Sequence, residues 1–251
     1  MLKTLKRALA TSDLLAFNLR NRDRWIAEQA KRVPAGSRVL DVGAGSAPYR
    51  PLFAHCDYKT QDFAQLKDEQ LRYGGYAPID FVSDADAIPI PDASVDVVLS
   101  TEVLEHVPEP IAVVMEFGRI LAPGGRLILT APLGSGIHQE PYHFYGGYTP
   151  YWYERFLSQA GFEAISVEPN AGSLRHVGQE TIRFAQLTRP FGFAAPWYVH
   201  LLWFPFWLLL APILALGVPL AASVLDKFDS ERRFTVGYHV TAIRKGGISR
   251  P

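Results

Sequence analysis

A short apolar run that ends in a glycine-rich turn constrains the fold more than any other stretch of this chain. The run Val39 to Val42 leads directly into Gly43-Ala44-Gly45. Because glycine has no Cβ, the backbone can turn sharply there and let a ligand lie against it. Such turns also follow strands in proteins that bind nothing, so later segments must decide. The stretch predicts the first strand of an α/β sheet and its ligand loop.

Strand-like and helix-like segments alternate after this turn, which indicates a mostly parallel sheet. The continuous apolar run at residues 95–99 is typical of a strand buried on both faces. Pro123-Gly124-Gly125 stops the helix that precedes the fifth strand. We expect further strands at residues 57–61, 79–83, 95–99, 126–130 and 162–168, and helices at 48–55, 109–121 and 149–160.

Composition limits the possible partners and compartments. The chain has 251 residues, a formal net charge of zero and 48% hydrophobic residues, which favours one globular domain with an appendage and gives no sign of a nucleic-acid partner. The single cysteine, Cys56, cannot form an internal disulfide. No Cys/His cluster has metal-ligand spacing, so we expect no metal and a reducing compartment, either the cytoplasm or the cytoplasmic face of a membrane.

The N-terminal segment, residues 1–36, is rich in lysine and arginine and carries leucines at helical spacing. These features predict one or two amphipathic helices before the first strand. We expect them to cover the sheet edge or the ligand cleft, with an independent membrane anchor as the alternative.

An acidic residue follows the second expected strand. Asp62 lies about 20 residues beyond the glycines, the separation at which a carboxylate reaches two adjacent ribose hydroxyls. We therefore expect Asp62 to be a ribose ligand. The alternative is a surface aspartate that closes a strand.

Several segments, in order and in register, resemble the class I S-adenosylmethionine-dependent methyltransferases, in the broad group of small-molecule, quinone and lipid methyltransferases. The matching segments are residues 41–45, Asp62, residues 84–85, 92–98 with 104–107, and 119–125. The resemblance runs from about Ser37 to Glu168 and implies an α/β, Rossmann-like, seven-stranded sheet with an antiparallel last strand between the fifth and sixth. Alternating residues within 233–245 suit that strand. Ala47 departs from the pattern, because many relatives have a third glycine there.

The resemblance implies S-adenosylmethionine as cofactor. It assigns the amides of the glycine turn to the methionine part, Asp62 to the ribose, and Asp84 with Ala85 to adenine. Pro48 stands where a dinucleotide dehydrogenase needs its last glycine, which argues against an NAD-dependent oxidoreductase. The complete expected cofactor-binding set is Asp41, Gly43, Ala44, Gly45, Asp62, Asp84, Ala85 and Ser100.

Methyl transfer from a sulfonium needs alignment and desolvation, and a hydroxyl acceptor also needs a base. Two histidines, a carboxylate and three aromatic residues crowd residues 136–145. His143, from this cluster, is the preferred candidate base. His106 is the second candidate, but it belongs to a segment that recurs in relatives of different specificity.

Residues 194–225 form a stretch of 32 residues without a formal charge. One membrane crossing needs about 20 apolar residues, but the strands on either side must pair in one sheet, so the segment has to return. Prolines at 196, 205, 212 and 219 would also break a straight helix. We expect a re-entrant or interfacial helical hairpin, with a buried cap or a subunit interface as alternatives. Its expected headgroup-level anchors are Trp197, Tyr198, Trp203 and Trp207.

The predicted division is therefore N-terminal helices at 1–36, a methyltransferase domain at 37–192 and 227–246, and a membrane-associated hydrophobic helical insertion at 193–226, between strands six and seven. The expected function is methyl transfer from S-adenosylmethionine to a small-molecule or lipid-like acceptor at the membrane surface. Such a protein would be peripheral or monotopic at the cytoplasmic membrane. The alternatives are a catalytically inactive, membrane-attached binding module and, less favoured, an NAD-dependent oxidoreductase.

Overall fold

The computed structural model describes residues 16–246, which divide into two compact units. One unit contains residues 22–168 and the segment that begins at Gly237, and it holds the sheet. Among the described residues, the other contains 16–21 and 169–236, and it is helical. The chain passes between the units inside helix α2 (Phe17–Ala30), after strand six and before strand seven.

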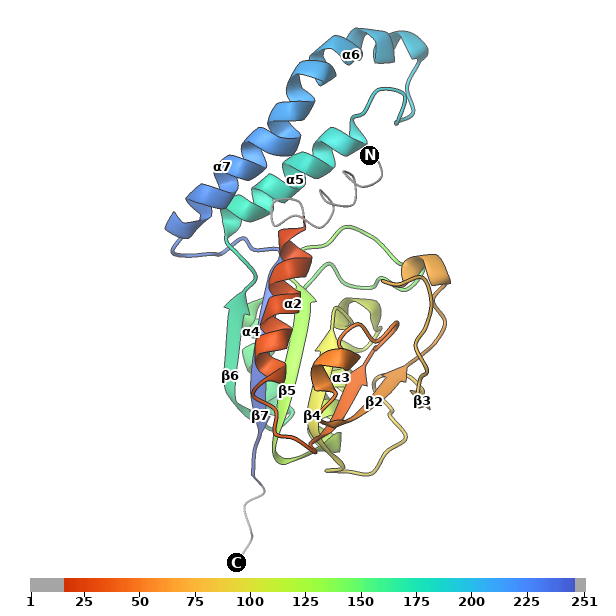
Figure 1. Ribbon diagram of the computed structural model, residues 1–251, viewed down its shortest axis with the longest axis vertical. Coiled ribbons are helices and arrows are strands. Elements are labelled where there is room, and N and C mark those ends of the chain that lie inside the picture. The colour runs from red at the N-terminus through yellow and green to blue at the C-terminus, as the bar shows by residue number, and fades with distance from the viewer. Residues whose placement is uncertain (1–15, 247–251) are drawn as a thin grey trace, which may run out of the picture. The chain divides into compact units, whose positions relative to one another are not determined.

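The sheet has seven strands in the order β3-β2-β1-β4-β5-β7-β6 (Figure 1). Strands β1, β2, β3, β4 and β5 pair in parallel, and β7 pairs antiparallel to β5. This arrangement confirms the predicted fold, including the position of the last strand. The strands are β1 (Arg38–Val42), β2 (Asp57–Asp62), β3 (Phe81–Val82), β4 (Val95–Thr101), β5 (Leu121–Pro132), β6 (Phe162–Pro169) and β7 (Gly237–Arg244).

Helices cover both faces of this sheet. On one face, α3 (Pro110–Ile120) and α4 (Pro150–Gln159) share a buried cluster with Val98 of β4. On the other, Ile26 of α2 packs in a second cluster with Leu99. Because successive side chains of a strand point to opposite faces, these two neighbours belong to different clusters, which explains the unbroken apolar run of β4.

The helix predicted at residues 48–55 is wrong in kind. Only a single 3-10 turn, η1 (Arg50–Phe53), forms there. The amides of Arg50 and Leu52 bond to carbonyls three residues earlier, and Pro51 has no N–H to extend an α-helical ladder.

The helical unit differs from the predicted hairpin. Residues 197–228 form one continuous helical run, composed of α6 (Trp197–Pro212), a π-helical segment (Ile213–Gly217), α7 (Val218–Leu225) and a 3-10 turn (Asp226–Phe228). The prolines did not break the run: two lie inside α6, and one lies in the first turn of α7. The π-helical segment between them gives the backbone a local change of pitch.

Helix α5 (Ser173–Leu187) packs beside α6 and α7 in this unit (Figure 1). Gly178 permits this close approach, because a Cβ there would lie 3.1 Å from the Cβ of Ala222. The indole N–H groups of Trp203 and Trp207 donate to carbonyls of Thr188 and Ala185 at 2.7 and 3.0 Å. Both indole N–H groups, which were predicted to meet lipid headgroups, thus bond to the C-terminal end of α5.

At the other end of this pair, the Asp226 carboxylate accepts from the amides of Gly172 and Arg175, each at 2.9 Å. These bonds satisfy amides of the first turn of α5 that have no partner within the helix. The part of the helical unit that lies between strands six and seven runs from Pro169 to Val236. The narrower predicted boundaries of the hydrophobic insertion, residues 193–226, stay a prediction.

Candidate active site

A cavity of about 460 Å³ opens at the carboxyl edge of the parallel strands, within the sheet unit. Its wall includes the turns that follow β1, β2 and β4, because the carboxyl ends of parallel strands meet at one edge. Six of the predicted cofactor residues line it: Gly43, Ala44, Gly45, Asp62, Asp84 and Ala85.

The glycine turn adopts backbone angles that favour glycine. Gly43 has φ +70°, and a Cβ there would lie 2.3 Å from Cγ2 of Val103. Gly45 has φ +52°. Ala47, where relatives carry glycine, also lies in the left-handed region at φ +46°, so the loop keeps its course despite the substitution.

The amides of this turn bond within the protein. Ala44 donates to the carbonyl of Gln61 at 3.0 Å, and Gly45 donates to Oδ2 of Asp62 at 2.9 Å. The two N–H groups predicted to face the methionine part therefore already have partners. What the turn offers the cavity is space free of side chains.

Asp62 is 3% exposed, and both of its carboxylate oxygens are oriented by the backbone. Oδ2 accepts from Gly45, and Oδ1 accepts from the amide of Ala64 at 2.9 Å. The Tyr76 hydroxyl also interacts with this carboxylate, whose remaining lone pairs can accept from hydroxyl groups in the cavity.

Asp84 and Ala85 begin a loop that α3 holds in place. Glu116 accepts from the amide of Ile88 at 2.7 Å, and Arg119 donates to the Ile88 carbonyl at 2.9 Å. Arg119 also forms an ion pair with Asp92 at 2.7 Å. The loop is therefore anchored at several points behind the cavity wall.

Two predicted cofactor residues lie outside the cavity wall. Asp41 is buried beneath the turn, where its carboxylate accepts from the Tyr58 hydroxyl. Burial, with a smaller contribution from the nearby Asp62 charge, raises the pKa of Asp41 to about 7. Ser100 is fully buried inside β4.

Of the two candidate bases, only His106 lines the cavity. His143 does not line the cavity, and its Nε2 lies 3.1 Å from the Ser135 hydroxyl. His106 does line it, with Nδ1 bonded to the Tyr142 carbonyl. Burial, aided by the neighbouring histidines, lowers the pKa of His106 to about 4, so its ring is neutral at pH 7.

Sequence reasoning missed an ion pair in the cavity wall. Arg22 of α2 lies 3.1 Å from Oε2 of Glu102, whose Oε1 accepts from the Thr130 hydroxyl at 2.8 Å. Glu102 has φ +54°, an uncommon angle for a residue other than glycine. The basic character of the N-terminal segment was the only available signal for Arg22.

The loop between β5 and α4 closes part of the cavity, a role that the sequence did not reveal. Gln139 donates to the Gln70 carbonyl at 2.9 Å, and Gln70 donates to the Glu140 carbonyl at 3.1 Å. The hydroxyl of Tyr142 donates to Gln65 at 3.0 Å. These bonds join the loop to the segment that follows β2.

The sequence profile of the methyltransferase domain family matches residues 40–129, from β1 into β5. The profile match, the strand order and the cavity at the carboxyl edge agree with one another. Residues 40–129 are a methyltransferase domain of the class I S-adenosylmethionine-dependent type. The profile covers the glycine turn, Asp62 and Asp84.

Curated bacterial proteins resemble this chain over about half of its length. An uncharacterized methyltransferase of Mycobacterium ulcerans is 33% identical over 134 residues, which cover 50% of this chain and 52% of the relative. A demethylmenaquinone methyltransferase of Renibacterium salmoninarum is 36% identical over 126 residues, which cover 47% and 51%. The chain spans about half the length of the curated relatives it matches.

Solved structures share the fold of this chain at low sequence identity. The cyclase SpnF is 19% identical with a TM-score of 0.52, covering 90% of this chain and 81% of that one. Phosphoethanolamine N-methyltransferase 2 of Haemonchus contortus is 17% identical with a TM-score of 0.51, covering 90% and 52%. Likeness at this level shows the fold alone, so the reaction must be argued from the site.

Proposed function

We propose that this protein binds S-adenosylmethionine in the cavity at the carboxyl edge and transfers its methyl group to a small-molecule or lipid-like acceptor. The observation that carries the proposal is the convergence of Asp62, Asp84 and the glycine turn on one cavity. S-adenosylmethionine supplies a methyl group activated by a sulfonium.

The wall suits that cofactor group by group. Asp62 can accept from the ribose hydroxyls, because backbone amides hold its two oxygens in place at the cavity wall. Asp84 can accept from the adenine amino group, and the Ala85 amide can donate to a ring nitrogen. The turn at Gly43 and Gly45 leaves room for the methionine part. Pro48, also in the wall, occupies the place of the last glycine that NAD binding requires.

The remaining wall contains few groups that could accept a proton from the acceptor. His106 is neutral and exposes a ring nitrogen lone pair, and Glu102 is paired with Arg22. The loop that carries Gln139 and Tyr142 limits access of water, which favours displacement at a methyl group. We therefore infer that alignment and desolvation of the reactants contribute most to the rate of methyl transfer, and that His106 is the candidate base.

We propose further that the helical run of residues 197–228 lies in the interface of a membrane and does not cross it. This run is long and apolar enough to span a bilayer, and only 11% of its most apolar window is buried. The chain leaves the sheet after β6 and returns to the same sheet at β7, so both ends of the helical unit lie on one side of the membrane. Helix α5, which pairs with this run, carries Arg175, Glu180 and Arg183. Moving these charges across a bilayer costs several kcal/mol.

Calorimetric titration with S-adenosylhomocysteine and, separately, with NAD tests the cofactor assignment. We expect S-adenosylhomocysteine to bind with one site per chain and NAD not to bind. Binding of NAD alone would overturn the proposal. Transfer of label from methyl-labelled S-adenosylmethionine into a membrane-lipid extract then distinguishes an enzyme from an inactive binding module.

A further inference from the structure

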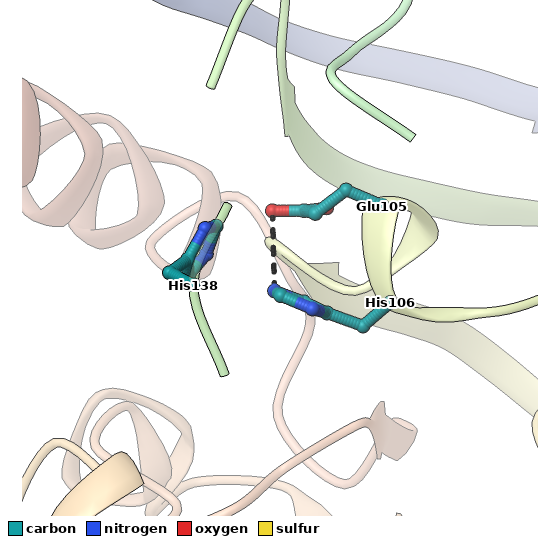
Figure 2. A group of neighbouring side chains, drawn as sticks. All are labelled: Glu105, His106 and His138. Carbon is teal, nitrogen blue, oxygen red and sulfur yellow. Dashed lines mark ion pairs between the residues drawn. The ribbon is translucent and has the colours of Figure 1, made fainter. Parts of the chain in front are cut away.

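Three side chains of metal-binding type meet beside the cavity. Glu105 and His106 belong to the turn η3 (Leu104–His106), and His138 comes from the loop between β5 and α4. One donor atom from each lies within 4.8 Å of the others, and Oε1 of Glu105 is 3.7 Å from Nε2 of His106 (Figure 2). We propose that Glu105, His106 and His138 bind a divalent transition-metal ion.

Hydrogen bonds already orient both imidazoles for this role. Nδ1 of His106 contacts the Tyr142 carbonyl, and Nδ1 of His138 lies 2.9 Å from the Gly136 carbonyl. A carbonyl oxygen can only accept, so each Nδ1 carries the hydrogen and each Nε2 keeps its lone pair. Metal-ligating histidines are usually held in this way, with the second nitrogen donating to a carbonyl or carboxylate.

Glu105 supplies the anionic ligand. Its side chain is 1% exposed, and its Oε2 has no hydrogen-bond partner among the described residues. An unpartnered carboxyl oxygen at this depth is costly, and a cation bound by both oxygens of the ionised Glu105 would remove that cost. The backbone carbonyl of Glu105 also accepts from the amides of Phe144 and Tyr145, which ties the loop that carries His138 to η3.

Two imidazoles and one carboxylate favour a transition metal over magnesium or calcium, which prefer oxygen ligands. In a tetrahedral zinc site with bonds of about 2.1 Å, donor atoms lie about 3.4 Å apart. Glu105 and His106 are close to that separation at 3.7 Å. The exposed side chain of His138 can close the remaining gap of about 1 Å by a small movement of its loop.

Three protein ligands leave a coordination position open, as in catalytic zinc sites. Because His106 lines the cavity, an ion held here would lie at the cavity wall. An oxygen of the acceptor that took the open position would lose its proton more readily. With the ion bound, the Nε2 lone pair of His106 would be a ligand and could not serve as the base. These consequences, unlike the ion site, rest on the proposed function.

The test uses tag-free, chelator-treated full-length protein titrated with Zn²⁺ by calorimetry and with Co²⁺ by visible absorption. We expect one ion per chain and the absorption of nitrogen- and oxygen-ligated Co²⁺. His138→Ala should weaken Zn²⁺ binding by more than about 100-fold, beyond the 10–100-fold typical of losing an outer-shell partner. Its side chain is exposed, so this variant should fold, and circular dichroism checks that it does.

His143→Ala is the matched control. The His143 ring lies 4.7 Å from that of His138, but its Nε2 is paired with Ser135, so Zn²⁺ affinity should not change. No saturable binding by the wild type, or equal losses in the two variants, would overturn the proposed ligand set. Affinity of the metal-free protein for S-adenosylhomocysteine is measured separately, so failure of the metal site and failure of the proposed function give different results.

Discussion

The Asp62 carboxylate accepts a hydrogen bond from the Gly45 amide over 2.9 Å, so the predicted ribose ligand also fixes the glycine turn. One side chain thereby connects the ends of β1 and β2 at the wall of the cavity. Positioning by the backbone before the ligand arrives lowers the ordering cost of binding.

Asp62→Ala should weaken binding of S-adenosylhomocysteine at least tenfold. Each charge-assisted hydrogen bond is worth about 1.5–3 kcal/mol, and about 1.4 kcal/mol corresponds to a factor of ten. Calorimetric titration measures the change. Asp57→Ala, at the opposite end of the same strand, is the control and should leave the affinity unchanged. Equal affinities of the Asp62 variant and the wild type would make Asp62 a structural residue only.

Gly43→Ala should destabilise the sheet unit and impair ligand binding. The new Cβ would meet Val103 at 2.3 Å in addition to the strain of φ +70°. We expect a loss of about 2–5 kcal/mol, the sum of left-handed strain and overpacking. Chemical unfolding gives this value.

Gly36→Ala is the matched control for Gly43→Ala. Gly36 has φ +78°, but a Cβ added there would meet no atom within 4 Å, so its substitution should cost only the backbone strain of about 1–2 kcal/mol. Val103→Ala combined with Gly43→Ala should restore part of the lost stability by removing the clash. If the two glycine variants lose equal stability, contact with Val103 is not the cause.

Asp41 should make stability depend on pH between about 4 and 7. Burial raises its pKa from an ordinary value of 3.8 to about 7, so the folded protein holds a proton that the unfolded chain releases. Stability from this group is complete below pH 4 and decreases as pH rises through 7, by up to about 1.4 kcal/mol per pH unit. Unfolding of the wild type and of Asp41→Asn at several pH values isolates this slope, which should be absent in the variant. Parallel pH profiles of the two proteins would contradict the shifted pKa.

Lysine substitutions on the helical run should prevent membrane attachment without unfolding the protein. Leu202 and Leu209 are 70% and 72% exposed, so Lys at both positions loses little packing. A lysine costs about 2.5–3.5 kcal/mol at the centre of a bilayer and less at the interface, so sedimentation with vesicles of phosphatidylcholine and phosphatidylglycerol should decrease at least tenfold.

Tyr151→Lys provides the control for the membrane variants, because Tyr151 is 79% exposed on α4, in the sheet unit. It should leave vesicle sedimentation unchanged, and every variant should keep its affinity for S-adenosylhomocysteine. Unchanged sedimentation of the double lysine variant would assign the apolar surface to a protein partner.

The sequence determined the α/β class of the domain and the place of its ligand site, and the resemblance to a known family implied the position of the last strand. Alternating apolar segments, the turn at Gly43 and the acid at Asp62 are local patterns, and parallel strands always bring their carboxyl ends to one edge. These features therefore predicted a cavity that the structure forms from turns far apart in the chain.

Tertiary structure decided which side chains reach that cavity. Asp41 had the right position in the sequence, but its bond to Tyr58 holds it beneath the turn, and Arg22 reached the wall from a helix outside the recognised segments. The sequence also did not reveal that α5 packs against residues 197–228. This pairing depends on hydrogen bonds of indole and carboxylate groups between residues far apart in the chain.

His138 shows the same limit at the proposed metal site. Spacing along the chain gave no sign of a ligand cluster, since His138 reaches Glu105 and His106 only through backbone bonds that fold its loop onto η3. Periodicity and turn chemistry act over a few residues and fix the elements. Contacts between distant loops depend on packing and on which buried polar groups find partners, and only the folded chain settles these.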